Sequence, residues 1–278
     1  MDHLLLSPPG KSSHLAPLML YRHALELGDS IGTLLRFGSS STASILLRAL
    51  FEASLGLEFI LLDNTFHEDR ASCYWAFYHI KRLETFVLYD PATPKGKEFH
   101  EILDSDPKLK NANFPRRDHG KERTKFELLL NQNPYKPFWD NYQCAIHKPK
   151  HWYSLCSTAK NLRNLGKLVG REAEYLLLYR MLSESAHASD VFTGVLATDA
   201  DKGVKVHLLR GPGEKIKEVT SLAANYLVWC HHQVLTTYFT QDHDVMKWFT
   251  QWYVGEYRPF FLWATTPESR TTPPTTSS

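Results

Sequence analysis

Apolar side chains return at helical spacing over most of the chain, and this periodicity is the feature that most constrains its fold. From Leu18 to Phe37 and from Ala43 to Leu62, apolar residues recur every three or four positions. The second segment is apolar on nearly every face, which is typical of a helix at the centre of a bundle. It also carries the charges Arg48, Glu52 and Glu58, which argue against a membrane span. We therefore expect a helical bundle that does not enter a membrane.

The same spacing predicts more helices along the chain. The segments are 68–88, 96–104, 120–131, 154–168, 171–186, 215–240 and 242–252. The expected fold class is therefore mainly α, a helical bundle of six or seven helices of useful length. Two β-prone runs around a turn-rich link predict one small β-hairpin near 191–209. An α+β fold is the alternative if that sheet is larger.

Composition separates a leader, a helical domain and a tail. Residues 1–16, which contain Ser, Pro, Gly and Lys, are expected to form a flexible leader. Pro17 then suits the first turn of the first helix, where its missing N–H costs nothing. Residues 17–264 are expected to form a single helical domain. Residues 265–278 contain mostly Thr, Pro and Ser, which predicts a disordered tail.

Residues 90–150 differ from the segments on either side, because prolines and charges are frequent there. We expect an irregular insertion with short helices separated by loops. The stretch 131–150 is expected to be irregular throughout, either as a lid or as a long connection.

Charge and cysteine usage exclude several classes of protein. A net charge of +2 does not by itself indicate a nucleic-acid partner. The four cysteines form no CxxC pair, so neither a zinc signature nor a disulfide framework is expected. Free thiols suit a reducing compartment, and no signal peptide is recognised, so the cytoplasm is the expected location. No glycine-rich phosphate loop occurs, so no nucleotide cofactor, and no other cofactor, is predicted.

Arg48 and Glu52 form the first candidate constellation. Four residues apart, they lie on the same face of the predicted helix. On a solvated helix such a pair contributes a few tenths of a kcal/mol. Here the surrounding sequence is apolar, and burying charges costs several kcal/mol per ion unless good partners offset it. The pair is therefore either part of a functional site or a structural ion pair that fixes helix packing.

A second constellation combines several chemical groups in one short segment. Tyr179, Ser183 and His187 are spaced by four and form one stripe of a helix. Arg180 lies two turns before His187 on the same side, with Glu184 between them. This helix would present an acid, a base, a hydroxyl and a cation together. The alternative is a polar helix end with a satisfied histidine.

Metal-binding patterns are incomplete. The pair Glu184 and His187 matches the Glu-x-x-His motif of di-iron bundles, which need two such motifs and two further glutamates. Glu52 would supply one carboxylate, but the second motif is missing, so no metal site is predicted. His231 and His232 are adjacent on a helix and point in different directions, which makes them a poor chelate.

Four motifs, taken in order, carry a family resemblance. They are YRHALEL at 21–27, ASILLRALFEA at 43–53, WYS at 152–154 and YRMLSESAHAS at 179–189. In these motifs the chain resembles a bacterial domain-of-unknown-function family, the one numbered 5677, over roughly residues 18–240. This resemblance implies no settled activity.

More distantly, the chain is similar to the HEPN group of helical bundles, whose ribonucleases carry Arg, four to six residues, then His on a late helix. Six residues separate Arg180 from His187, although Met181 departs from the Asn, Asp or His that often follows the Arg. The resemblance implies a metal-independent ribonuclease of bacterial defence or toxin systems that binds RNA as a homodimer. His187 would act as general acid or base near the ribose 2′-OH, and Arg180 would stabilise the phosphate charge.

Two other hypotheses stand beside the ribonuclease. One is a non-catalytic binding or regulatory module, with a structural Arg48, Glu52 and His187 network and an exposed aromatic surface between Trp248 and Trp263. The other is an enzyme of a different class, including one with a metal held by Glu52, Glu184 and His187.

Overall fold

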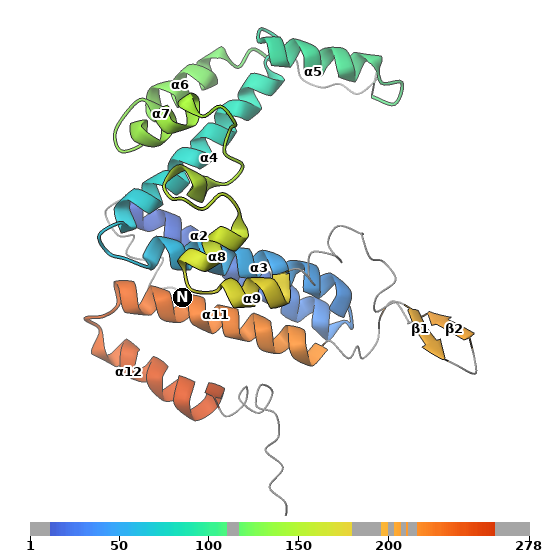
Figure 1. Ribbon diagram of the computed structural model, residues 1–278, viewed down its shortest axis with the longest axis vertical. Helices are drawn as coiled ribbons and strands as arrows, with labels where there is room; N and C mark the ends of the chain where they lie inside the picture. Colours follow the sequence, from blue (N-terminus) through green and yellow to red (C-terminus); the bar gives the residue numbers. More distant parts are fainter. Residues whose placement is uncertain are drawn as a thin grey trace, which may run out of the picture. The chain divides into compact units, whose positions relative to one another are not determined.

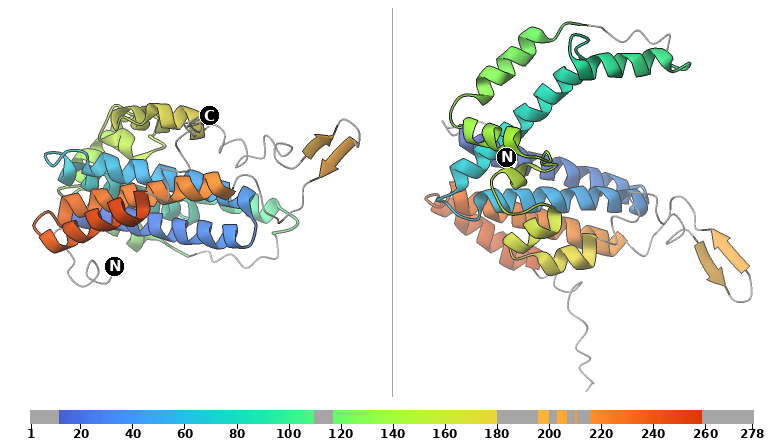
Figure 2. Two further views of the ribbon diagram at one scale, coloured as in Figure 1. Left: turned by 90° about the horizontal axis from the view of Figure 1, so that it is seen from below. Right: turned by 45° about the horizontal axis from the view of Figure 1, so that its top comes forward.

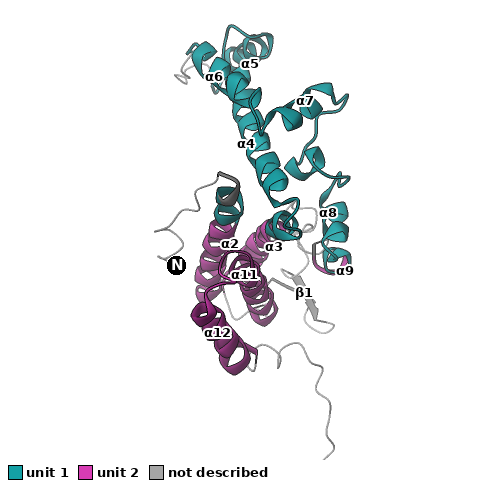
Figure 3. Ribbon diagram, turned by 90° about the vertical axis from the view of Figure 1, so that its left-hand side faces the viewer, with its two compact units in different colours: residues 1–20, 55–175 teal, residues 21–54, 176–278 magenta. Residues whose placement is uncertain are grey.

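The computed structural model describes residues 12–109, 117–179, 196–199, 203–206, 210 and 216–258. The fold is mainly α-helical, as expected. The described residues contain ten α-helices rather than six or seven, because several short helices join the long ones (Figure 1). The chain divides into two compact units (Figure 3). Unit 1 comprises Met1–Leu20 and Leu55–Tyr175, and unit 2 comprises Tyr21–Ser54 and Leu176–Ser278.

Unit 2 contains most of the first two helices and two helices from the end of the chain. The four are α2 (Ser12–Arg36), α3 (Ser40–Leu61), α11 (Ile216–Tyr238) and α12 (His243–Trp252). In both views of Figure 2 the orange α11 runs alongside the blue α3. The ring of Phe51 on α3 lies 5.4 Å from that of Tyr226 on α11. On α2, a Cβ added at Gly28 would approach Leu227 to 2.5 Å, so the two helices are in close contact.

The turn between α2 and α3 follows from one glycine. Gly38 has φ +74°, in the left-handed region that glycine adopts without steric cost. The amide of Ser39 then donates to the carbonyl of Leu34 at 2.9 Å, which satisfies a carbonyl at the end of α2. The predicted helix end at this glycine is confirmed.

The start of α2 differs from the expectation. The helix begins at Ser12, so the flexible leader predicted over residues 1–16 is wrong for residues 12–16. Pro17 lies inside the helix, just beyond the first turn, where its ring removes only the bond to the carbonyl of Ser13. Ala16 is fully buried, so packing offsets that lost bond. Residues 1–11 lie outside the described part of the chain.

Unit 1 is organised around α4 (His67–Tyr89), the long diagonal helix of Figure 1. It is contacted by α5 (Pro94–Ser105), α6 (Gly120–Leu130), α7 (Lys136–Cys144) and a 3₁₀ helix (Trp152–Leu155). One face of α4 buries apolar residues at helical spacing. With residues from three neighbouring elements they form one core: Cys73, Ala76, Ile80, Leu83, Leu130, Tyr142 and Leu155.

Two stretches of unit 1 differ from the sequence prediction. The segment 131–150 was expected to be irregular, yet it contains α7, because Pro137 lies in the first turn of that helix rather than interrupting it. The single helix predicted over 154–168 is instead the 3₁₀ helix and α8 (Leu162–Leu168). Asn161 separates them, since its side chain accepts from the amide of Asn164 at 2.9 Å and starts a new helix.

Beyond α8, the structure describes the chain only in part up to the start of α11. Gly170 has φ +78° and breaks the helix as predicted. Then α9 (Glu172–Glu174) leads into a π-helical turn, Tyr175–Tyr179. Strands β1 (Leu196–Asp199) and β2 (Gly203–Val206) pair antiparallel within the range where a hairpin was expected. Residues 191–195 and 207–209 lie outside the described part, as does the predicted tail 265–278.

No helix in the described segments combines the length and apolarity needed to cross a membrane.

Candidate functional site

The Arg48–Glu52 pair lies on α3 within unit 2. The Nε of Arg48 donates to Oε1 of Glu52 at 3.1 Å. The side chain of Arg48 is 19% exposed and that of Glu52 is 41% exposed. Leu47 and Phe51, beside them on the helix, are fully buried. The predicted pairing and partial burial are therefore confirmed, with the cation deeper than the carboxylate.

This arrangement defines what the pair can do chemically. A guanidinium fixed by a carboxylate on its own helix has lost much of its conformational freedom. Fixed guanidinium groups bind phosphate and carboxylate oxygens through charge-assisted hydrogen bonds. Because Arg48 is partly buried, any such bond would be screened less by water than one at the surface.

The second constellation reaches the edge of the described region. The backbone of Tyr179 closes the π-helical turn that begins at Tyr175. Arg180, Ser183, Glu184 and His187 lie outside the described residues, as does the side chain of Tyr179. The structure thus brings Arg48 and Glu52 together, while their proximity to the Arg180–His187 segment stays a prediction.

A partly buried polar pair that the sequence analysis did not predict joins α2 to α11. The hydroxyl of Tyr21 lies 2.6 Å from Nδ1 of His231. Burial, and then the neighbouring Cys230, raise the pKa of Tyr21 to about 12. Burial lowers the pKa of His231. At neutral pH both side chains are therefore uncharged, and the histidine tautomer sets which of them donates. No local spacing predicts this pair, because its members belong to opposite ends of the chain.

Unit 1 contains a concave surface of its own, between α4, α5, α6 and α7. The cavity has a volume of about 360 Å³. Apolar, aromatic and charged side chains line it. The residues are Ile80, Leu83, Glu84, Val87, Lys95, Glu127, Trp139, Tyr142, Gln143 and Lys148.

Several polar side chains that line the cavity already form hydrogen bonds inside the unit. The hydroxyl of Tyr142 and the ammonium of Lys81 both donate to Glu84. Burial by itself raises the pKa of Glu84, but these two hydrogen bonds outweigh it and lower the pKa. Lys148 donates to the backbone carbonyls of Tyr142 and Gln143 at 2.8 and 3.0 Å, at the end of α7. The cavity's polar groups therefore act mainly as structural ties between helices.

Comparison with known proteins assigns the chain to a family. The family of unknown function DUF5677 matches residues 14–203. The chain belongs to this family. The resemblance drawn from the sequence motifs is therefore confirmed, and the DUF5677 region includes Arg48, Glu52 and the whole segment Tyr179–His187. No curated protein and no solved structure matches the chain.

Beyond the DUF5677 region, α11 and α12 carry a group of aromatic residues, here called the aromatic cluster. Its members are Trp229, Trp248, Trp252 and Tyr253. Their rings contact one another or the rings of Phe249 and His232, which also contact each other. Trp248 is 57% exposed and stacks on Trp252 at 6.4 Å. Trp229 and Tyr253 are 42% and 38% exposed. The cluster therefore contributes both to packing and to the surface.

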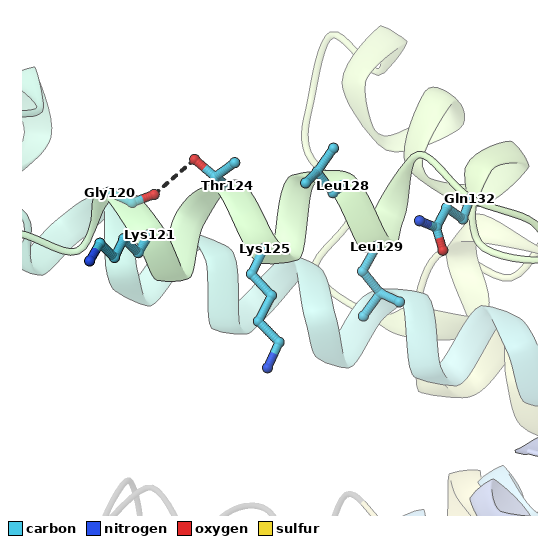
Figure 4. Close-up of a pocket in the computed structure, with 7 residues that line it drawn as sticks. All are labelled: Gly120, Lys121, Thr124, Lys125, Leu128, Leu129 and Gln132. Atoms are coloured by element: carbon cyan, nitrogen blue, oxygen red, sulfur yellow. Dashed lines mark hydrogen bonds between the residues drawn. The ribbon is translucent and has the colours of Figure 1, made fainter.

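Within the DUF5677 region, a larger but open hollow of about 600 Å³ runs along α6. Of the residues that the structure describes, those that line it belong to α6, together with Gln132 (Figure 4). Thr124 and Leu128 point to one side of the helix, whereas Lys125 and Leu129 point to the other. The hydroxyl of Thr124 donates to the carbonyl of Gly120 at 2.9 Å. Side chains that diverge in this way form a helix surface rather than a site.

Among the described residues, no group of three or more His, Cys, Asp or Glu side chains is arranged to hold a metal ion.

Proposed function

We propose that this DUF5677 protein is a metal-independent ribonuclease resembling the HEPN bundles, with Arg48, Glu52, Arg180 and His187 at its centre. The observation that carries the proposal is the Arg48–Glu52 ion pair, which keeps a partly buried cation in an otherwise apolar stretch of α3. Burying a charged side chain costs free energy, and charged groups in unusual environments are often found at functional sites.

The backbone before Arg180 gives independent support. Tyr175–Tyr179 form a π-helical turn, and turns of this kind are rare and occur frequently at functional sites. A π turn inserts one extra residue and so changes the direction in which the following side chains point.

In the proposed reaction the ribose 2′-oxygen attacks the adjacent phosphorus and the bond from phosphorus to the 5′-oxygen breaks. His187 takes the 2′ proton, or gives one to the departing 5′-oxygen, and the products are a cyclic phosphate and a 5′-hydroxyl. Arg180 stabilises the negative charge that develops on the phosphate. Arg48, oriented by Glu52, adds a second cation. Tyr179, Ser183 and Glu184, which belong to the same predicted helix, are assigned to contacts with the RNA.

RNA cleavage by the purified protein in EDTA tests the proposal. His187→Ala and Arg180→Ala are expected to lose cleavage by a factor of about 10² or more while circular dichroism stays unchanged. Arg48→Ala is expected to lose activity as well. Its matched control is Arg22→Ala. Arg22 also belongs to an i, i+4 ion pair of unit 2, but its side chain is 63% exposed. Equal activity of the Arg48 and Arg22 variants, or cleavage that survives without His187, would refute the assignment.

The exposed aromatic cluster favours a second candidate, a non-catalytic binding module in which Arg48 and Glu52 are only structural. Trp and Tyr are enriched at protein–protein interfaces, and more than half of the surface of Trp248 is exposed to solvent. In this reading the partner is a second copy of the chain. Well-folded wild type that cleaves no RNA, together with self-association that Trp248→Ala weakens in analytical ultracentrifugation, would favour this candidate over the ribonuclease.

A further inference from the structure

Two of the four cysteines meet inside unit 1. Cys73 on α4 donates its thiol to the carbonyl of Trp152 at 3.2 Å. Cys156, directly after the 3₁₀ helix, donates its thiol to the carbonyl of Tyr153 at 3.7 Å. Cys156 packs against the core cluster that contains Cys73, and the two thiols donate to the carbonyls of adjacent residues, Trp152 and Tyr153. Both are free thiols.

We propose that Cys73 and Cys156 are an oxidation site, at which hydrogen peroxide converts the two thiols into a disulfide that fastens the 3₁₀ helix to α4. The carbonyls that accept from the two thiols belong to adjacent residues, so the disulfide would join two elements that already pack against each other.

Their unequal burial sets the order of reaction. Cys73 is fully buried, whereas Cys156 is partly exposed and is the thiol that peroxide reaches. Burial, with the contact to Cys156 adding to it, raises the pKa of the Cys73 thiol well above its usual value. Cys73 therefore stays protonated and reacts second.

The chemistry balances in two steps. Peroxide transfers one oxygen to the Cys156 sulfur, giving a sulfenic acid, while the remaining oxygen leaves as water. The Cys73 sulfur then attacks the Cys156 sulfur, the sulfur–oxygen bond breaks, and the hydroxyl leaves as water with the Cys73 proton. In total two thiols are oxidised to one disulfide and one peroxide is reduced to two waters.

The bond would act on the core of unit 1. The Trp152 ring lies 5.2 Å from Tyr74 and 5.7 Å from Phe59, so the 3₁₀ helix carries a core side chain. A disulfide between Cys73 and Cys156 closes a loop that contains α5, α6 and α7. Long closed loops restrict the unfolded chain strongly, so oxidation is expected to raise Tm by roughly 5–10 °C.

The test uses the full chain with Cys144→Ser, which removes an exposed thiol that would link separate molecules. After hydrogen peroxide, intact mass is expected to fall by two hydrogen atoms, and peptide mapping to find residues 73 and 156 joined. The rise in Tm should reverse with dithiothreitol. Adding Cys156→Ser, at a partly exposed position, should abolish both changes, and Cys73→Ala should do the same.

Other outcomes would overturn the proposal. They are a Cys156 that gains oxygen atoms without forming the disulfide, a disulfide that involves Cys230, or a loss of two hydrogens that persists in the Cys156→Ser variant. If Cys73→Ala does not fold, the peptide map and the Cys156→Ser variant decide the question without it.

Discussion

At the scale of single residues, the Tyr21–His231 pair illustrates how burial sets a protonation state. His231 accepts from Tyr21 only while its Nδ1 carries no proton, and burial lowers its pKa in the folded protein. The unfolded chain has the ordinary histidine pKa of about 6.5. Above that pH both states are neutral at this residue. Below it the unfolded chain binds a proton that the folded protein does not, so the folded state loses stability.

We therefore predict that the free energy of unfolding falls as pH drops from about 7.5 to 5.5, with His231 contributing at most about 1.4 kcal/mol per pH unit. Thermal unfolding followed by circular dichroism at several pH values measures this. His231→Gln should flatten the dependence, and His243→Gln, at an exposed position, should not. An unchanged slope in His231→Gln would mean that other groups, such as His79, whose pKa burial also lowers, cause the acid lability.

Individual residues also show which side-chain contacts could be predicted from the sequence. Arg48 and Glu52 could be paired from their spacing alone, because both belong to one helix and i, i+4 contacts are local. The partner of His231 could not, since only the packing of α2 on α11 brings Tyr21 to it. The same holds for Cys73 and Cys156, which share no local pattern.

At the scale of elements, helical periodicity located α3, α4 and α11 to within a few residues, because each is long and carries apolar residues at helical spacing along its length. The method failed where the stripe was short. The stretch 131–150 was expected to be irregular, whereas Pro137 lies in the first turn of α7. The apolar residues over 154–168 belong to a 3₁₀ helix and to α8 rather than to a single helix.

The start of α5 provides an element-scale prediction. Thr93 caps the helix by accepting from the amide of Gly96 at 2.9 Å, and a Cβ at Gly96 would lie 1.8 Å from the carbonyl oxygen of Asp90. Because that oxygen belongs to backbone, the clash cannot be relieved by a rotamer change. Gly96→Ala should lower the free energy of unfolding by about 1–3 kcal/mol.

Gly32→Ala is the matched control, since nothing lies within 4 Å of the added Cβ at that helical position. It should stabilise the protein by about 0.5–1 kcal/mol in urea titration. A Gly96→Ala protein as stable as wild type would show that the α4–α5 turn opens without cost.

At the scale of the whole molecule, the boundaries between the two units fall inside helices. One lies between Leu20 and Tyr21 in α2, one between Ser54 and Leu55 in α3, and one between Tyr175 and Leu176 in the π-helical turn. Helix formation is cooperative along a chain. Unfolding of one unit is therefore expected to unfold the parts of α2 and α3 that belong to the other unit as well. This division could not be predicted from the sequence, because the boundaries coincide with no loop or change in composition. The expectation of one domain over 17–264 stays a prediction.

We predict a single heat-capacity peak in calorimetry. Phe51→Ala in unit 2 and Leu130→Ala in unit 1 each truncate a fully buried side chain and should lower stability by about 2–5 kcal/mol. Both should move the whole peak to lower temperature. If either variant splits the peak in two, the units unfold independently and the shared helices do not couple them.

The order of the segments has a consequence for synthesis on the ribosome. The apolar side of α3 is made early, yet its partner α11 is made only after all of unit 1 between residues 55 and 175 has been produced. At about 5–20 residues per second, the nascent chain exposes that surface for on the order of ten seconds or more. During that interval α3 is a binding site for chaperones and a point at which unfinished chains can associate, so the rate of translation through unit 1 influences the yield of folded protein.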